Sequence, residues 1–316
     1  MQYRPLGRSG LLVSPLCFGG NVLGWTADEK TSFSLLDAWL DAGFNFIDTA
    51  DVYSRWAPGH AGGESETVIG RWLKQGGRRD KVVIATKVGL DMGQGATLKP
   101  DYIRRAVEDS LRRLQVERID LYQSHRDDPD TPLEATLETY AGLIAAGKVK
   151  AIGASNFSAT RLAQALDTSK RLGFPRYESL QPLYNLYDRA EFEGELRDVC
   201  LRSDVGVINF YALAAGFLTG KYRVPDDASK SVRGKNTVAK YVNQRGLRIL
   251  AAVDQVADRL GATPARVAIA WNMAQPGITS PIASATSLAQ LSELAAATRL
   301  KLDAENMALL DQASRS

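Results

Sequence analysis

The sequence predicts one (β/α)8 TIM barrel domain that spans residues 1–316, with a short β-hairpin at its N-terminus. Eight short apolar segments alternate with helical segments, and no linker or low-complexity stretch interrupts them. Several of the apolar segments end at a charged or polar residue, as strands do at the carboxyl face of a barrel. A doubly wound sheet is the alternative, but the glycine fingerprint expected after its first strand is missing.

The composition is that of a globular protein without a nucleic-acid or membrane partner. Of the 316 residues, 45% are hydrophobic and 24% are charged, with a formal net charge of only +3. The sequence shows no apolar run of about 18 residues and no signal-peptide core. Cys17 and Cys200 lack a CxxC spacing and are expected to be buried thiols in a reducing compartment. We therefore expect a cytoplasmic protein.

The chain opens with the hairpin and the first β/α unit. Gly7–Gly10 is predicted to be the turn of the hairpin. The apolar segment 16–20 follows as the first barrel strand, and its final glycines indicate a close approach of the backbone to another group. Apolar residues then recur at helical spacing over 33–40, and Gly43 ends that helix.

The second and third strands both end in charged residues. The apolar run Phe44–Ile47 stops at Asp48, and Tyr53 follows five residues later. An apolar run that ends at an acid is typical of a buried parallel strand that opens into a polar mouth. A helix over 64–73 then leads to the third strand, 81–87.

The fourth and fifth units follow the same pattern. Pro100 opens a helix with apolar residues on one face, and the next strand, 119–125, ends in a histidine. Thr131–Glu134 predicts a capping box with proline at the first helical position, and Gly147 ends that helix. The fifth strand is expected at 149–156.

The last third of the chain contains an insertion. Strands six and seven are expected at 177–181 and 204–210, and the insertion covers 212–236. The remaining elements are expected at 247–260 and 264–274 for two helices and at 278–283 for strand eight.

Four chemically active side chains are predicted to meet at one mouth. Asp48, Lys87 and His125 end strands two, three and four, and Tyr53 lies just beyond strand two. Taken singly, Asp48 is explained as a cap and Lys87 as a surface residue. Their occurrence on neighbouring strand ends favours a catalytic site.

This combination suits proton delivery to a carbonyl oxygen. A tyrosine with a pKa near ~10 is a poor acid at neutral pH. Lys87 would lower that pKa, Asp48 would hold the lysine, and His125 would orient the carbonyl. The sequence contains no nucleophilic serine or cysteine motif and no metal-binding motif. The attacking species is therefore expected to be a hydride from a cofactor.

The chain resembles the aldo-keto reductases almost from end to end. This resemblance implies that a nicotinamide cofactor exchanges hydride with an aldehyde, ketone or sugar-type carbonyl or alcohol. It also implies that Tyr53 is the general acid or base, with Asp48 and Lys87 as its tuning pair and His125 as the orienting group. The segments that carry the resemblance are Phe46–Tyr53, Ala85–Lys87, Gly153–Asn156, Gln181–Asn185 and Gly216–Tyr222.

The resemblance also implies cofactor contacts. Ser155, Asn156 and Gln181 would hold the nicotinamide carboxamide, and Phe210 would stack on the ring. Relatives usually follow the stacking aromatic with Ser-Pro-Leu, so whether Tyr211 supplies the lost hydroxyl is open here. Further predicted contacts, including those that line the pyrophosphate, are Gly20, Asn21, Leu213, Gly216 and Lys221.

The sequence leaves open whether the cofactor is NADP(H), which carries a 2′-phosphate, or NAD(H), which does not. Relatives that use NADPH commonly place a cation after strand eight, but residues 281–297 contain none, and the corresponding positions are Ser284 and Thr286. Arg233 in the insertion either reaches over instead or is a solvated loop residue. Ser287 and Gln290 predict a capping box. The remaining assignments place Gln290 on the adenine and Glu293 near the ribose. The family favours NADP(H), and the local chemistry favours NAD(H) or dual use.

The substrate side is predicted from three residues. Trp25 and Trp56 would form an apolar wall, and Arg126 would bind an anionic or hydroxyl-rich substrate or pair with Asp127. A binding protein that resembles potassium-channel β subunits is the alternative to an enzyme, but such subunits usually lack the histidine that His125 supplies. The predicted partner is a small molecule, and the oligomeric state is open.

Overall fold

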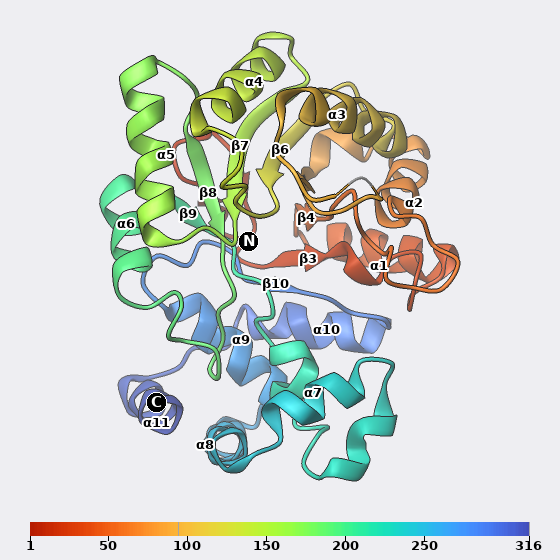
Figure 1. Ribbon diagram of the computed structural model, residues 1–316. Helices are drawn as coiled ribbons and strands as arrows, with labels where there is room; N and C mark the ends of the chain where they lie inside the picture. The colour runs from red at the N-terminus through yellow and green to blue at the C-terminus, as the bar shows by residue number, and fades with distance from the viewer. Residues whose placement is uncertain (94, 316) are drawn as a thin grey trace.

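The computed structural model describes residues 1–93 and 95–315, and its main sheet is a (β/α)8 barrel (Figure 1). The strands are β3 (Cys17–Gly19), β4 (Phe46–Asp48), β5 (Val83–Val88), β6 (Ile119–Ser124), β7 (Val149–Ser155), β8 (Tyr177–Gln181), β9 (Gly206–Val207) and β10 (Ile282–Ala283). All eight are parallel, in the order β10, β3, β4, β5, β6, β7, β8, β9. A bridge between Val207 and Ile278, with a hydrogen bond from Thr279 N to Val207 O (2.8 Å), joins β9 to the segment that leads into β10. The predicted barrel is confirmed.

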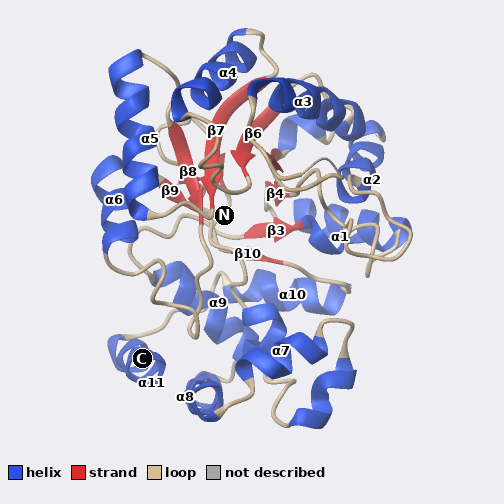
Figure 2. Cartoon of the chain, in the orientation of Figure 1, coloured by secondary structure: helices blue, strands red, loops and turns tan. Residues whose placement is uncertain are grey.

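The helices lie outside the strands (Figure 2). They are α1 (Glu29–Asp41), α2 (Glu64–Lys74), α3 (Pro100–Leu114), α4 (Leu133–Ala145), α5 (Ala159–Leu172), α6 (Glu195–Ser203), α8 (Gln244–Leu260), α9 (Pro264–Ala274), α10 (Leu288–Ala297) and α11 (Ala304–Ser314). The insertion before α8 holds the 3₁₀ helices η3 (Ala214–Thr219) and η4 (Pro225–Lys230) and the helix α7 (Gly234–Tyr241). Among the described residues, no helix is both long and apolar enough to cross a membrane.

The N-terminal hairpin packs against apolar residues of the barrel strands. Its strands, β1 (Arg4–Pro5) and β2 (Leu12–Val13), pair antiparallel, as predicted. Leu6, Leu11 and Val13 are buried against an inward-facing apolar layer, and each side chain contributes about 1.5–3 kcal/mol by leaving water. The barrel residues of that layer are Cys17, Phe46, Ala85, Leu121, Ala151, Ile208 and Ile282.

A polar layer lies directly above the apolar one. Side chains alternate along a strand, so the residue two positions further on also points into the barrel. In β4, β5 and β6 that residue is Asp48, Lys87 and Gln123, and all three are buried. The strand period therefore sets these three polar side chains together near the carboxyl ends of the strands.

Of two local predictions, the structure contradicts one and agrees with the other. The capping box at Thr131 is wrong, because α4 begins at Leu133 and has no side-chain cap. The Thr131 hydroxyl instead donates to Asp128 (2.7 Å), which holds the loop before α4. At the end of β3, a Cβ on Gly20 would lie 2.9 Å from Asp48 O, so the group that the backbone approaches there is β4.

Candidate active site

Tyr53 meets Asp48 and Lys87 at the polar layer. The Lys87 ammonium donates to Asp48 Oδ2 (2.6 Å) and to Thr49 O (2.8 Å). It also donates to Tyr53 Oη (3.1 Å), so all three of its protons have an acceptor. His125 follows β6, and its ring centroid lies 5.9 Å from that of Tyr53. The structure thus brings the four predicted residues together.

Burial and charge set the protonation states of this group. Burial raises the pKa of Tyr53 above its ordinary value, Lys87 opposes this, and Asp48 adds to it. The net direction is opposite to the expected one, because the lysine cannot offset burial together with the nearby carboxylate. Burial lowers the pKa of Lys87, but the charges and hydrogen bonds of Asp48 and Tyr53 together outweigh it and leave the pKa raised. At neutral pH the site therefore holds a neutral phenol beside an ammonium group.

His125 is a neutral imidazole in this environment. Burial, followed by the charge of Lys87, lowers the pKa of His125 well below its ordinary value. Its Nδ1 is buried and has no hydrogen-bond partner among the described residues. An unpaired acceptor costs less there than an unpaired N–H, so the proton belongs on Nε2. The ring then offers an N–H donor to a ligand.

Two amides hold Asp48, and sequence reasoning connected neither of them to it. Asp48 Oδ1 accepts hydrogen bonds from Gln181 Nε2 (2.9 Å) and from Gln123 Nε2 (3.2 Å). Gln181 was predicted only as a cofactor contact, and Gln123 was not predicted at all. The alternation of side chains along β6 would have predicted that Gln123 points into the barrel, because it lies two residues after the inward-facing Leu121.

Asp51 is a buried carboxyl two residues before Tyr53. Neither of its oxygens has a hydrogen-bond partner among the described residues. Burial raises the pKa of Asp51 to about 8, and the nearby Glu66 adds to the shift. The folded protein therefore keeps a proton that the unfolded chain loses near pH ~3.9. The free energy of unfolding should fall as the pH rises from about 4 to about 8.

Replacing Asp51 with asparagine should remove this pH dependence. We expect Asp51→Asn to be more stable relative to the wild type at pH ~7.5 than at pH ~5, by about 3 kcal/mol. Urea unfolding at the two pH values measures the difference. The exposed Asp226→Asn is the control and should show no such change. An equal effect of Asp51→Asn at both pH values would contradict the assignment.

The residues predicted at the nicotinamide lie at the ends of β7 and β8. Ser155 Oγ donates to Gln181 O (2.9 Å), and Asn156 Nδ2 donates to His125 O (2.9 Å). Asn156 is exposed and has a left-handed backbone (φ 55°), which asparagine tolerates better than most residues. Among the described residues, none donates a hydrogen bond to the Gln181 amide oxygen. Neutral donors and acceptors of this kind fit a carboxamide.

The predicted stacking and pyrophosphate residues follow β9. Phe210 and Tyr211 lie side by side, with ring centroids 5.2 Å apart, and Tyr211 is exposed. Leu213 O accepts from Gly216 N (2.9 Å) and closes the next turn. Gly216 has φ 90°, and a Cβ there would lie 3.2 Å from Lys221 Nζ. The glycine therefore leaves room for the Lys221 ammonium against this loop.

Arg233 reaches from the insertion to the ends of β3 and β10. Its guanidinium lies over the Trp25 ring, 4.9 Å from the centroid. With the Asn21 amide oxygen turned toward it, Asn21 accepts from Nη1 (3.1 Å) and Nη2 (2.5 Å), and Asn21 Nδ2 donates to Ser284 Oγ (2.6 Å). We adopt this amide orientation because the opposite one sets the NH₂ group against the guanidinium donors. Arg233 therefore contacts Asn21 and Trp25, and its predicted role at a 2′-phosphate stays a prediction.

The segment after β10 is held by its own hydrogen bonds. Ser287 Oγ accepts from Gln290 N (3.3 Å), which forms half of the predicted capping box. The other half differs, because Gln290 Oε1 accepts from Thr286 N (2.8 Å) rather than from Ser287. The Glu293 carboxylate accepts from Arg266 (2.5 Å) and from Thr263 Oγ1 (2.7 Å). Glu293 is therefore already paired within the protein.

An aromatic wall lines one side of the mouth. Trp56 lies edge-on to Tyr53 (5.5 Å between centroids) and to Trp25 (5.6 Å). Arg126 is exposed nearby in the chain, after His125. Arg126 Nε donates to the Asp127 backbone oxygen (3.4 Å), whereas the Asp127 carboxylate pairs with Arg161 (2.8 Å).

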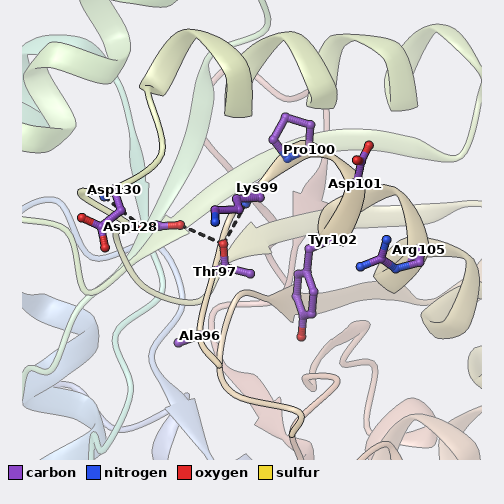
Figure 3. Close-up of a pocket in the computed structure, with 9 residues that line it drawn as sticks. All are labelled: Ala96, Thr97, Lys99, Pro100, Asp101, Tyr102, Arg105, Asp128 and Asp130. Carbon is purple, nitrogen blue, oxygen red and sulfur yellow. Dashed lines mark hydrogen bonds between the residues drawn. The ribbon is translucent and has the colours of Figure 1, made fainter. Parts of the chain in front are cut away.

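A separate polar cavity of about 650 Å³ lies beside the start of α3 (Figure 3). None of the four predicted catalytic residues lines it. Its Asp128 is engaged by Thr97 Oγ1 (3.1 Å) and Leu98 N (2.7 Å), so this carboxylate braces two loops. Residues 1–93 and 95–315 contain no group of three or more His, Cys, Asp or Glu side chains that would hold a metal ion. The candidate site at Tyr53 and Lys87 is thus separate from this cavity. The residues that line the cavity are Ala96, Thr97, Lys99, Pro100, Asp101, Tyr102, Arg105, Asp128 and Asp130.

Comparison with known proteins agrees with this geometry. A sequence model of the Aldo/keto reductase family matches residues 15–315. The chain is 36% identical to an uncharacterized oxidoreductase, YrpG, of Bacillus subtilis, over 98% of this chain and 95% of that protein. It is 34% identical to a probable voltage-gated potassium channel subunit beta of Arabidopsis thaliana (93% and 90%) and 30% identical to an L-glyceraldehyde 3-phosphate reductase of Escherichia coli (99% and 92%). The chain belongs to the aldo/keto reductase family and is a nicotinamide-dependent oxidoreductase.

Proposed function

We propose that the protein reduces an aldehyde or ketone, or oxidises the corresponding alcohol, with Tyr53 as the general acid or base. The observation that carries the proposal is the hydrogen bond from Lys87 Nζ to Tyr53 Oη, beside the ion pair of Lys87 and Asp48. A bound nicotinamide would supply or accept the hydride. Ser155, Asn156, Gln181 and Phe210 are the residues that would hold it.

The proton chemistry follows from the charges around Tyr53. An alkoxide is a far stronger base than a phenolate, so a neutral phenol with a raised pKa still protonates the developing oxyanion. Lys87 stabilises the phenolate that remains. His125, which is neutral, would donate a hydrogen bond from Nε2 to the carbonyl oxygen and turn it toward Tyr53. In the oxidative direction the phenolate form of Tyr53, stabilised by Lys87, would take the proton from the alcohol.

The aromatic wall supports a substrate that carries a ring or an apolar chain. Trp25 and Trp56 contribute flat apolar surface next to the proposed acid. Arg126 is exposed and supports binding of an anionic or hydroxyl-rich group at the rim.

The test is an assay of aldehydes, ketones and sugars with NADPH and NADH, together with the corresponding alcohols and oxidised cofactors. We expect turnover of at least one carbonyl class. Tight cofactor binding without turnover of any member would instead favour a binding protein, the role suggested by the name of the Arabidopsis relative. Absence of both binding and turnover would contradict the proposal.

We also propose that Arg233 binds the 2′-phosphate of NADPH, so that NADP(H) is the preferred cofactor. Residues 281–297 supply no cation, whereas Arg233 lies against Asn21, next to Ser284. A guanidinium has five N–H donors, and Asn21 engages two of its nitrogens. The remaining donors support binding of a phosphate that arrives beside Ser284.

Replacing Arg233 with glutamine should weaken NADPH binding by about tenfold or more, because a charge-assisted hydrogen bond is lost. Binding of NADH should change by less than about twofold. Quenching of protein fluorescence on titration with each cofactor measures both affinities. Arg223→Gln, in the same insertion but paired with Asp254, is the control. An equal loss for both cofactors, or equal wild-type affinities, would refute a role in phosphate recognition.

A further inference from the structure

The loop between Tyr53 and α2 is closed by one carboxylate. Glu64 is the first residue of α2, and its Oε2 accepts from Ser54 N (3.2 Å) at the start of the loop. At the other end, Ala61 N donates to Oε1 (2.8 Å), and Gly62 N donates to Oε1 (3.2 Å) and Oε2 (3.1 Å). A single side chain therefore ties both ends of the segment Ser54–Gly62.

The backbone of Tyr53 is held by the same helix start. Its carbonyl oxygen accepts from Gly63 N (3.0 Å) and Ser65 N (3.3 Å), two N–H groups that a helix N-terminus leaves free. The next N–H along the chain, that of Ser54, donates to Glu64. The peptide group that follows Tyr53 is thus fixed at both its oxygen and its nitrogen.

This loop also carries part of the aromatic wall. Trp56 is 48% exposed and makes edge contacts with Tyr53 and Trp25. His60 Nδ1 lies 2.9 Å from Ser54 Oγ and 3.9 Å from Glu64 Oε2, and Arg55 Nη1 donates to Asp91 O (2.7 Å). These contacts brace the loop from the side, whereas the Glu64 carboxylate accepts from Ser54 N at its start and from Ala61 N and Gly62 N at its end.

A carboxylate suits this position better than an amide. Ser54, Ala61 and Gly62 each donate a backbone N–H to Glu64, and a carboxylate offers only acceptors. Burial raises the pKa of Glu64, but the hydrogen bonds from the backbone outweigh it and leave the pKa lowered. A glutamine would turn an NH₂ group toward at least one of these donors.

We propose that Glu64 is a positioning residue that holds Tyr53 against Lys87 and Trp56 against Tyr53. It touches neither substrate nor cofactor. It therefore governs the rate with bulky apolar substrates through the placement of the acid and of the wall. The inference rests on the proposed function of Tyr53.

The variant Glu64→Gln tests this role. We expect kcat/KM for an aromatic aldehyde to fall about 10- to 100-fold, since small displacements of catalytic groups have effects of this size. The loss for a small aliphatic aldehyde should be lower, because it does not use Trp56. Cofactor affinity should stay within about twofold, because the proposed cofactor residues are not part of this loop. Glu195→Gln is the matched control, since Glu195 is the exposed first residue of α6.

A titration separates positioning from a general loss of structure. Withdrawal of Tyr53 from Lys87 should raise the pKa of Tyr53 further, by about half a unit or more. Ultraviolet difference titration, with each variant read against its own Tyr53→Phe counterpart, measures this pKa without turnover. The result therefore stands even if no carbonyl is reduced, which would be a failure of the proposed function alone.

The outcomes are distinct. Glu64→Asp keeps the acceptor-only carboxylate and should fall between the wild type and Glu64→Gln, and it carries the test if the glutamine variant does not fold. Wild-type kinetics and an unchanged Tyr53 titration in Glu64→Gln would overturn the proposal. A uniform loss for both aldehydes that parallels a loss of cofactor binding would also overturn it.

Discussion

Replacing Tyr53 with phenylalanine is expected to lower kcat for carbonyl reduction by about 10²- to 10⁴-fold, the range for loss of a general acid. The phenol is the proton donor in contact with Lys87 (3.1 Å). Phenylalanine keeps the ring that packs edge-on against Trp56 and His125, so the shape of the mouth should persist. Steady-state kinetics and a cofactor titration on the same preparation measure the two effects.

Cofactor binding is the internal control for this variant. The residues proposed to hold the nicotinamide, Ser155 and Asn156, bond to Gln181 O and His125 O and make no hydrogen bond with the Tyr53 phenol. The affinity should therefore change by less than about twofold. Tyr102→Phe removes a part-buried phenol elsewhere, which donates only a long hydrogen bond to Leu90 O (3.4 Å), and it should leave turnover unchanged. Near-native turnover of Tyr53→Phe would show that another group donates the proton to the carbonyl oxygen.

The barrel and the four-residue cluster were predictable because they follow from the pattern of strands and from the alternation of side chains along each strand. Asp48 and Lys87 lie two residues after inward-facing apolar residues, so a correct strand assignment also fixes where they point. His125 follows directly from the end of β6. The same period also indicates Gln123, although sequence reasoning did not use it.

Other features depend on contacts between segments that are distant in sequence. Asn21, Arg233 and Ser284 come from three parts of the chain, and only the fold shows that they meet. The capping box at Thr131 fits the local pattern, but Asp128 takes the hydroxyl first. The net direction of the Tyr53 pKa was missed for a related reason. Sequence supplies the charge of Lys87, whereas the cost of burial appears only in the folded protein.

Replacing Lys87 with methionine is expected to lower kcat by about 10³-fold or more and to destabilise the fold. Lys87 is the main influence that lowers the pKa of Tyr53, while burial and Asp48 raise it. Without the lysine, the pKa of Tyr53 rises further and the phenol becomes a weaker acid. The variant also leaves the buried Asp48 without its cation, which should destabilise the fold by about 3–5 kcal/mol.

A double variant separates the loss of chemistry from the loss of stability. In Lys87→Met with Asp48→Asn, the unpaired buried charge is gone, and the two glutamine amides can still donate to the asparagine oxygen. We expect the double variant to regain most of the lost unfolding free energy, measured by urea denaturation, and to regain almost none of the lost turnover. If turnover returned together with stability, Lys87 would act only as the partner of a buried acid. If neither returned, the ion pair would be needed for the fold itself, and the pH–rate profile would then be the remaining measure of the effect of Lys87 on Tyr53.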